Sequence, residues 1–144
     1  MRSARHGKGG FTLIEIMIVV AIVALLTAIT IPFLTRVRMN AFEGAAKQNL
    51  RVIATSAEAY RTNQTPPTYP PNLQALGGAN PPYIDSRLAG GSCQGYNYNY
   101  SLVSAAQFTC TATPVTPNIT GINIYFVDES GVIRYTDASG QPIE

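Results

Sequence analysis

Histidine, cysteine and charged residues are all scarce in this chain of 144 residues, and these absences narrow the possible functions. The one histidine, His6, lies in the first ten residues, so no imidazole remains elsewhere for acid–base chemistry or metal binding. The two cysteines are too few ligands for a metal site on their own. No glycine-rich phosphate motif and no pair of acids placed for catalysis is evident. We therefore expect no enzymatic activity, no metal and no cofactor.

Charge is low and unevenly distributed. Charged residues make up 12% of the chain and its formal net charge is +2. The first ten residues carry Arg2, Arg5 and Lys8, whereas residues 64–144 have two basic and five acidic side chains, a net charge of −3. A sequence-independent DNA-binding protein needs clustered cations that displace phosphate counterions. We therefore expect no nucleic-acid partner for the C-terminal part.

The chain does have one long apolar run, from Phe11 to Leu34, in which Glu15 is the single charged residue. In a helix these 24 residues extend roughly 36 Å, which is enough to cross a bilayer, whereas a secretory signal has a shorter apolar core. The preceding basic residues favour a cytoplasmic N-terminus and an external C-terminal domain. Since an unpaired carboxylate is unfavourable within a membrane, Glu15 indicates that a cation arrives from another molecule.

The stretch Gly10-Phe11-Thr12-Leu13-Ile14-Glu15 and the apolar run after it resemble the type IV pilin and pseudopilin signature. In that family a dedicated prepilin peptidase cuts after the glycine, here Gly10, and methylates the new N-terminal residue, here Phe11. The resemblance implies that residues 1–10 are a leader that is removed. It also implies that Glu15 pairs with the Phe11 ammonium of a neighbouring subunit in a filament. The short leader and the Phe resemble the type IVa class.

Pro32 interrupts the uniform apolar pattern. Proline has no N–H and crowds the carbonyl four residues earlier, at Ala28, so we expect a kink or a local opening of the helix. Thr27 and Thr30 are candidates to satisfy part of the freed backbone. Two interpretations remain open at this point. One is a simple bend, and the other, implied by the resemblance, is a segment before Pro32 that extends when subunits pack.

Residues 35–63 form an amphipathic helix by their periodicity. Apolar residues recur at steps of three and four along one stripe, which we expect to pack against a sheet: Met39, Phe42, Ala46, Leu50, Ile53, Ala57 and Tyr60. Charged residues occupy the other faces: Arg38, Glu43, Lys47, Arg51, Glu58 and Arg61. Of these, Glu43 and Lys47 are spaced for an i, i+4 ion pair. The helix is expected to run from Phe11 to Thr62, roughly 78 Å, before the prolines that follow Asn63.

Residues 64–144 predict a small domain of loops and antiparallel strands. Proline and glycine dominate residues 64–95, which we interpret as a loop with one helical turn at residues 73–76. Strands are expected at residues 96–102, 107–112, 122–127 and 132–135, with a turn at residues 128–131. Packed on the amphipathic helix, they make an α+β domain, and the arrangement resembles the pilin fold.

Cys93 and Cys110 lie on the external side in this topology, where the compartment is oxidising. We expect a disulfide between them, from the start of the first strand to the second. It would close a loop of about 17 residues and contribute about 3 kcal/mol in the loop-entropy model.

The resulting functional hypothesis is a structural subunit of a type IV pilus, used for adhesion, twitching motility or DNA uptake. Its expected partners are further copies of itself, the prepilin peptidase, an inner-membrane assembly platform and the membrane. It would be a single-pass inner-membrane protein before assembly and part of an extracellular pilus afterwards. The alternative is a single-pass membrane anchor with no role in assembly, although an anchor needs neither Glu15 nor the Gly10-Phe11 junction.

Two rivals to the pilus subunit remain open. The first is a type II secretion pseudopilin in a periplasmic filament; a calcium site would favour it, but the spacing of Asp128, Glu129 and Asp137 matches no calcium-ligand pattern. The second is a low-copy minor pilin with a binding role at the filament tip.

Overall fold

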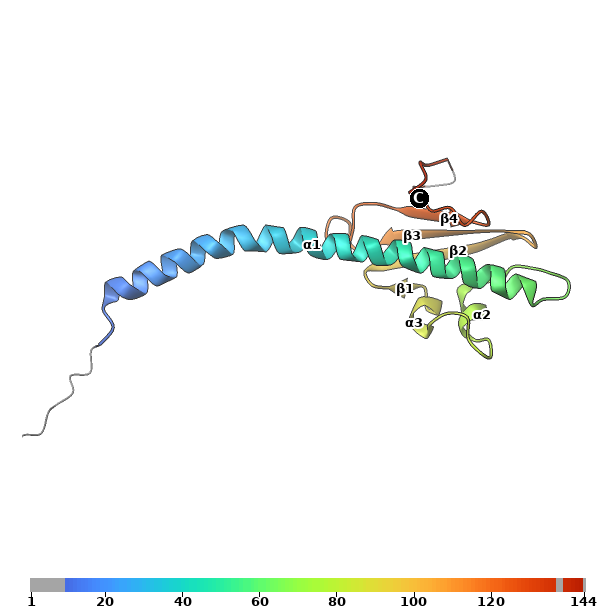
Figure 1. Ribbon diagram of the computed structural model, residues 1–144, viewed down its shortest axis with the longest axis horizontal. Coiled ribbons are helices and arrows are strands. Elements are labelled where there is room, and N and C mark those ends of the chain that lie inside the picture. Colours follow the sequence, from blue (N-terminus) through green and yellow to red (C-terminus); the bar gives the residue numbers. More distant parts are fainter. Residues whose placement is uncertain (1–9, 137–138, 144) are drawn as a thin grey trace, which may run out of the picture. The chain divides into compact units, whose positions relative to one another are not determined.

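The computed structural model describes residues 10–136 and 139–143. The predicted leader residues Arg2, Arg5, His6 and Lys8, and the acidic residue Asp137, lie outside this part of the chain. One long helix precedes two short helices and a five-stranded sheet (Figure 1). Neighbouring strands are antiparallel, and their order in the sheet is β1-β2-β3-β4-β5. The predicted α+β class is confirmed.

Helix α1 runs from Leu13 to Thr62 and contains Pro32. The chain divides into two compact units between residues 36 and 37. Within the first unit the Thr27 and Thr30 hydroxyls donate to the carbonyls of Val23 and Leu26, at 2.7 and 2.8 Å. The prediction that they compensate for the proline is wrong in detail. Each of these two hydroxyls bonds the carbonyl four residues before itself, so neither reaches the carbonyl of Ala28. The kink at Pro32 stays a prediction.

The second unit has its core between α1 and one face of the sheet. The predicted apolar stripe is confirmed, because Ala46, Leu50, Ile53 and Ala57 are fully buried. Strand β2, Tyr96–Ser104, begins with alternating tyrosines and asparagines, and Tyr96 and Tyr98 point into this core while the asparagines are exposed. Strand β3, Gln107–Pro114, adds Phe108, Cys110 and Ala112 to the same core. Burial of these apolar surfaces is the main stabilising term for so small a domain.

Short elements complete the sheet and its flank. Helix α2 spans Leu73–Gly77, close to the predicted turn, whereas α3, Ser86–Ala89, and β1, Ser92–Cys93, were not predicted. Strands β1 and β2 are joined through Gln94 and Gly95, both with positive φ, as a tight type I′ hairpin turn requires.

The last two strands are shorter than predicted. Strand β4 spans Tyr125–Asp128 and β5 spans Arg134–Tyr135, with the expected turn between them. Strand β4 begins three residues later than expected because the N–H groups of Ile122 and Asn123 donate to Glu43 of α1. These two residues are therefore tied to the helix.

Gly121 offers a stability test of the contact between this segment and β2. A Cβ at this buried position would overlap the hydroxyl and ring of Tyr96, whose side chain is itself fully buried. We expect Gly121→Ala to lower the free energy of unfolding by about 1–3 kcal/mol, as overpacked cores do. Gly44→Ala is the matched control: nothing lies within 4 Å of the added methyl, so it should stabilise α1 by about 0.5–1 kcal/mol. Thermal unfolding of the detergent-solubilised chain measures both, and equal effects would contradict the overlap with Tyr96.

Candidate functional site

The N-terminal end of α1 is built around a reciprocal cap formed by Thr12 and Glu15. The Thr12 N–H and the Thr12 hydroxyl both donate to Oε2 of Glu15 at 2.8 Å, and the Glu15 N–H points to the Thr12 hydroxyl at 3.3 Å. This arrangement is a capping box, which satisfies backbone donors that the first helical turn leaves without partners. Glu15 therefore has a role inside its own chain as well as any role between chains.

This cap was not predicted, although the sequence carries its signal. Thr12 and Glu15 have the Thr-x-x-Glu spacing of a capping box directly before an apolar run. Among the described residues, Oε1 of Glu15 accepts no hydrogen bond, so this oxygen is free to meet a cation. The predicted ion pair and the cap are thus geometrically compatible.

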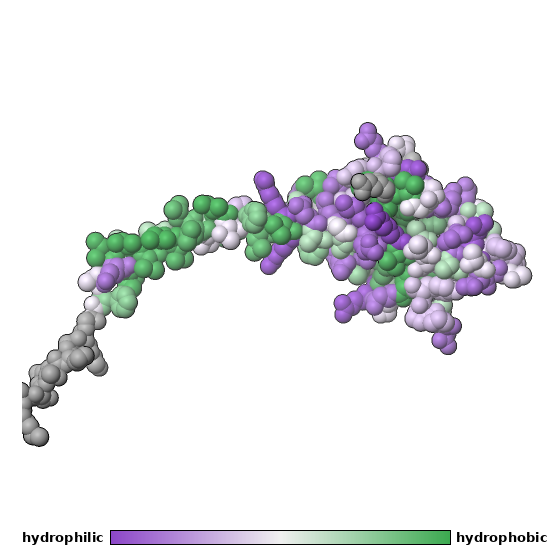
Figure 2. Space-filling view, in the orientation of Figure 1, coloured by the Kyte–Doolittle hydropathy of each residue, from purple (hydrophilic) through white to green (hydrophobic). Residues whose placement is uncertain are grey.

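Next to this cap, the side chains of the apolar run are exposed, because no other part of the described chain packs on them. Phe11 is 84% exposed, and every large apolar residue from there to Val37 is at least 46% exposed. Figure 2 shows the run as a nearly continuous hydrophobic surface. By length and composition, α1 contains a stretch able to cross a membrane. An apolar surface of this extent requires lipid or other helices around it.

The two cysteines require a correction. Cys93 and Cys110 are free thiols in the structure, so the predicted disulfide is wrong for this fold. Cys93 pairs with Tyr96 across β1 and β2, whereas Cys110 pairs with Tyr100 across β2 and β3. The cysteines thus flank β2 from opposite sides and are offset by four residues along it. Neighbouring strands lie roughly 5 Å apart, and each residue advances roughly 3.3 Å along a strand. Two strand spacings and a four-residue offset therefore place the two Cα atoms far beyond the 7 Å limit for a disulfide.

Alkylation measures the state of these thiols. Burial raises the pKa of the Cys110 thiol to about 12, so it stays protonated and unreactive near neutral pH. We expect iodoacetamide to leave Cys110 unmodified in the folded chain. After denaturation without a reductant, both cysteines should be alkylated, adding two groups to the intact mass. A denatured chain that accepts alkyl groups only after reduction would contradict the free-thiol arrangement.

A second polar cluster lies where α1 meets the segment before β4. Glu43 accepts hydrogen bonds from the backbone of Ile122 and Asn123, from the Asn123 side chain, and from the Tyr125 hydroxyl, at 2.8 to 3.2 Å. Burial opposes ionisation of this carboxyl, but the four hydrogen bonds outweigh burial and hold its pKa below the ordinary value.

The expected Glu43–Lys47 ion pair is not present. Instead, the Lys47 ammonium lies 5.9 Å from the centre of the Tyr125 ring. The Glu43 carboxylate therefore meets the segment before β4 instead of Lys47. No sequence pattern reveals this contact, because the partners lie about 80 residues further along the chain.

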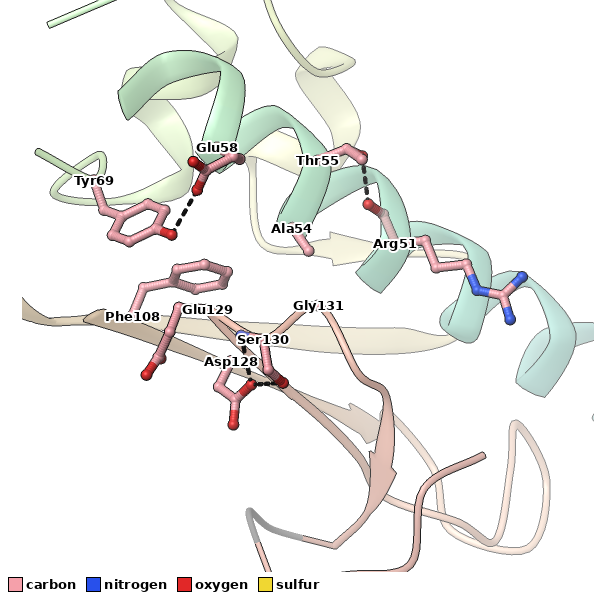
Figure 3. A pocket seen from close by; sticks show the side chains of 10 residues that line it. All are labelled: Arg51, Ala54, Thr55, Glu58, Tyr69, Phe108, Asp128, Glu129, Ser130 and Gly131. Atoms are coloured by element: carbon pink, nitrogen blue, oxygen red, sulfur yellow. Dashed lines mark hydrogen bonds between the residues drawn. The ribbon is translucent and has the colours of Figure 1, made fainter. Parts of the chain in front are cut away.

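A groove of about 410 Å³ lies between α1 and the β4–β5 turn (Figure 3). Its rim carries the carboxylates of Glu58, Asp128 and Glu129. All three already have partners: the Tyr69 hydroxyl donates to Glu58 at 2.6 Å, Asp128 pairs with Arg134, and Gln107 donates to Glu129. None of these carboxylates is therefore left without a partner for a ligand to supply.

The chain is similar to known proteins over part of its length. The family model described as the prokaryotic N-terminal methylation motif matches residues 5–31. The chain is 43% identical over 51 residues to the type IV major pilin protein PilA of Myxococcus xanthus, a match covering 35% of this chain and 23% of that protein. No solved structure matches significantly.

A second relative is matched over most of its length. The chain is 30% identical over 76 residues to the competence protein ComGC of Halalkalibacterium halodurans, a match covering 53% of this chain and 72% of that protein. The methylation motif and both relatives point to the same family. The chain belongs to the type IV pilin family.

Proposed function

We propose that this protein is a structural subunit of a type IV pilus that polymerises through the N-terminal part of α1. The observation that carries this proposal is the apolar surface of residues 11–37, exposed throughout and bearing one carboxylate. Packing against the same surface of further copies would cover it once the chain leaves the membrane. The family is a structural one, in agreement with this role.

The proposed maturation follows the family motif. The prepilin peptidase cuts after Gly10 and methylates Phe11, and an inner-membrane platform then adds the subunit to the filament. Phe11 is exposed and lies outside the helix, directly before Thr12, so its backbone is accessible to a processing enzyme. Of the uses of such a filament, competence is favoured by the match to a competence protein over most of that protein's length.

Mass spectrometry of filaments sheared from the cell surface tests this function. We expect an abundant N-terminal peptide that begins at methylated Phe11. Processed protein found only in the cell envelope would replace the pilus with a periplasmic secretion pseudopilus, and a scarce processed peptide in filaments would indicate a minor pilin. An intact Met1 start on mature material would contradict the cleavage site.

A further inference from the structure

The loop between β3 and β4 exposes an unusual concentration of aliphatic side chains. Within residues 115–124, Val115, Ile119, Ile122 and Ile124 are 50%, 60%, 60% and 37% exposed. Single exposed aliphatic residues are ordinary, but four within ten residues of one loop are a concentration that calls for a partner. We call these four residues the loop patch.

The loop patch is held in place by several hydrogen bonds. The Val115 N–H donates to the carbonyl of Gly95 at 2.9 Å, and the Asn118 N–H closes the loop on the carbonyl of Gly121 at 2.9 Å. Glu43 of α1 then fixes Ile122 through its backbone N–H at 2.8 Å. The loop is therefore attached to α1 at Glu43, six residues after the second unit begins at Val37. In Figure 1 it extends beyond the sheet on the side where α1 enters the domain.

This attachment lies close in sequence to the end of the apolar run. Glu43 follows Leu34 by nine residues, which a helix spans in roughly 13 Å. The run itself, roughly 36 Å long as a helix, exceeds the hydrocarbon thickness of roughly 30 Å, so its last residues reach the headgroup layer. Along α1, only these nine residues separate that layer from the residue that holds the loop.

The charges between these two points also suit a lipid surface. Arg36 and Arg38 are exposed, and neither forms an ion pair within the described residues. Arginine side chains near the end of a membrane helix place their apolar stems along the acyl chains and their guanidinium groups among anionic headgroups. Hydrophobic side chains beside such cations are the composition of a membrane-surface contact.

We propose that the loop patch is a membrane-contact surface, seated in the headgroup region of the bilayer while the subunit awaits assembly. The proposal rests on the proposed function, in which residues 11–34 span that bilayer. Lipid contact by Ile119 and Ile122 would shield the patch from water before polymerisation. It would also hold the domain at the membrane surface through Glu43.

Because the chain contains no tryptophan, single tryptophans can report depth in the membrane. Full-length Ile119→Trp and Ile122→Trp chains are reconstituted in vesicles of phosphatidylethanolamine and phosphatidylglycerol with brominated acyl chains. We expect their emission to be quenched about twofold relative to unbrominated vesicles, as for side chains at the acyl boundary. Val103→Trp is the matched control, since Val103 is 61% exposed but lies at the opposite end of β2 from the loop. Its emission should be unchanged.

A fourth variant separates this inference from the proposed function. Val23→Trp lies within the apolar run and must be quenched if that run spans the bilayer. Quenching at position 23 without quenching at positions 119 and 122 would overturn the membrane-contact proposal. A second copy of the chain would then be the partner that covers the loop patch. Equal quenching at position 103 would overturn it too. Absence of quenching at position 23 would instead contradict the membrane-spanning role.

Discussion

Glu15→Ala is expected to leave the chain in the membrane but to reduce filament yield by about a hundredfold or more. In the proposed filament, the carboxylate pairs with the Phe11 ammonium of a neighbouring subunit inside an apolar bundle. Removing one partner of a buried ion pair typically destabilises by about 3–5 kcal/mol. Each 1.4 kcal/mol is about tenfold in an equilibrium constant, so assembly should nearly cease. Sheared filaments quantified against total subunit in the membrane measure the effect.

The capping box complicates this experiment, because alanine removes the charge and the cap together. Glu15→Gln separates the two, since glutamine at this position can still accept the Thr12 N–H bond but carries no charge. Thr12→Ala does the reverse and leaves the carboxylate intact. If the ion pair drives assembly, Glu15→Gln should fail as alanine does, and Thr12→Ala should assemble near normally. The opposite pattern would make the cap the functional element and would remove the ion-pair assignment.

The helix and the main strands were predictable because their signals are local. The stripe from Met39 to Tyr60 follows from the helical period, and the alternation from Tyr96 to Asn99 from the strand period, each within one short segment. The end of α1 at Thr62 agrees with prediction because prolines follow closely. The cap at Thr12 was also within reach, since it too depends on local spacing.

The remaining features depend on register and on contacts between distant segments. A disulfide was predicted between Cys93 and Cys110 because they are the only two cysteines and were expected in an oxidising compartment. The two thiols are apart because β1 and β3 pair with opposite edges of β2. The late start of β4 depends on Glu43, a charged helical residue whose periodicity suggested solvent. Sequence spacing carries no information about which buried donors will meet such a carboxylate.

Glu43→Ala is expected to lower the free energy of unfolding of the domain by about 3 kcal/mol. It leaves the N–H groups of Ile122 and Asn123 and the Tyr125 hydroxyl without their charged acceptor, and hydrogen bonds to charged groups contribute about 1.5–3 kcal/mol. A melting temperature lower by about 10 °C would follow for a domain of this size. Glu129→Gln is the control, because this exposed carboxylate accepts a single bond from Gln107 and its loss should be nearly neutral.

The same carboxylate should make the domain sensitive to acid. The pKa of Glu43 is lower in the folded state than in the unfolded chain, so its contribution is complete above the unfolded value of about 4.3. That contribution disappears as the pH falls through the lower folded pKa. Asp128 adds a similar dependence: burial opposes its ionisation, but Ser130 and Arg134 outweigh burial and lower its pKa.

The neutral variant isolates the share that belongs to Glu43. We expect Glu43→Gln to be less stable than the parent at pH 7. The difference between the two should shrink as the pH falls below about 4, because the parent then loses its carboxylate charge too. Chemical denaturation of the detergent-solubilised chains at several pH values measures this difference. If it stayed constant from pH 7 to pH 3, the ionised carboxylate would not be what holds the segment before β4. The loop patch would then be held to the rest of the domain by the hydrogen bond from the Val115 N–H to the Gly95 carbonyl.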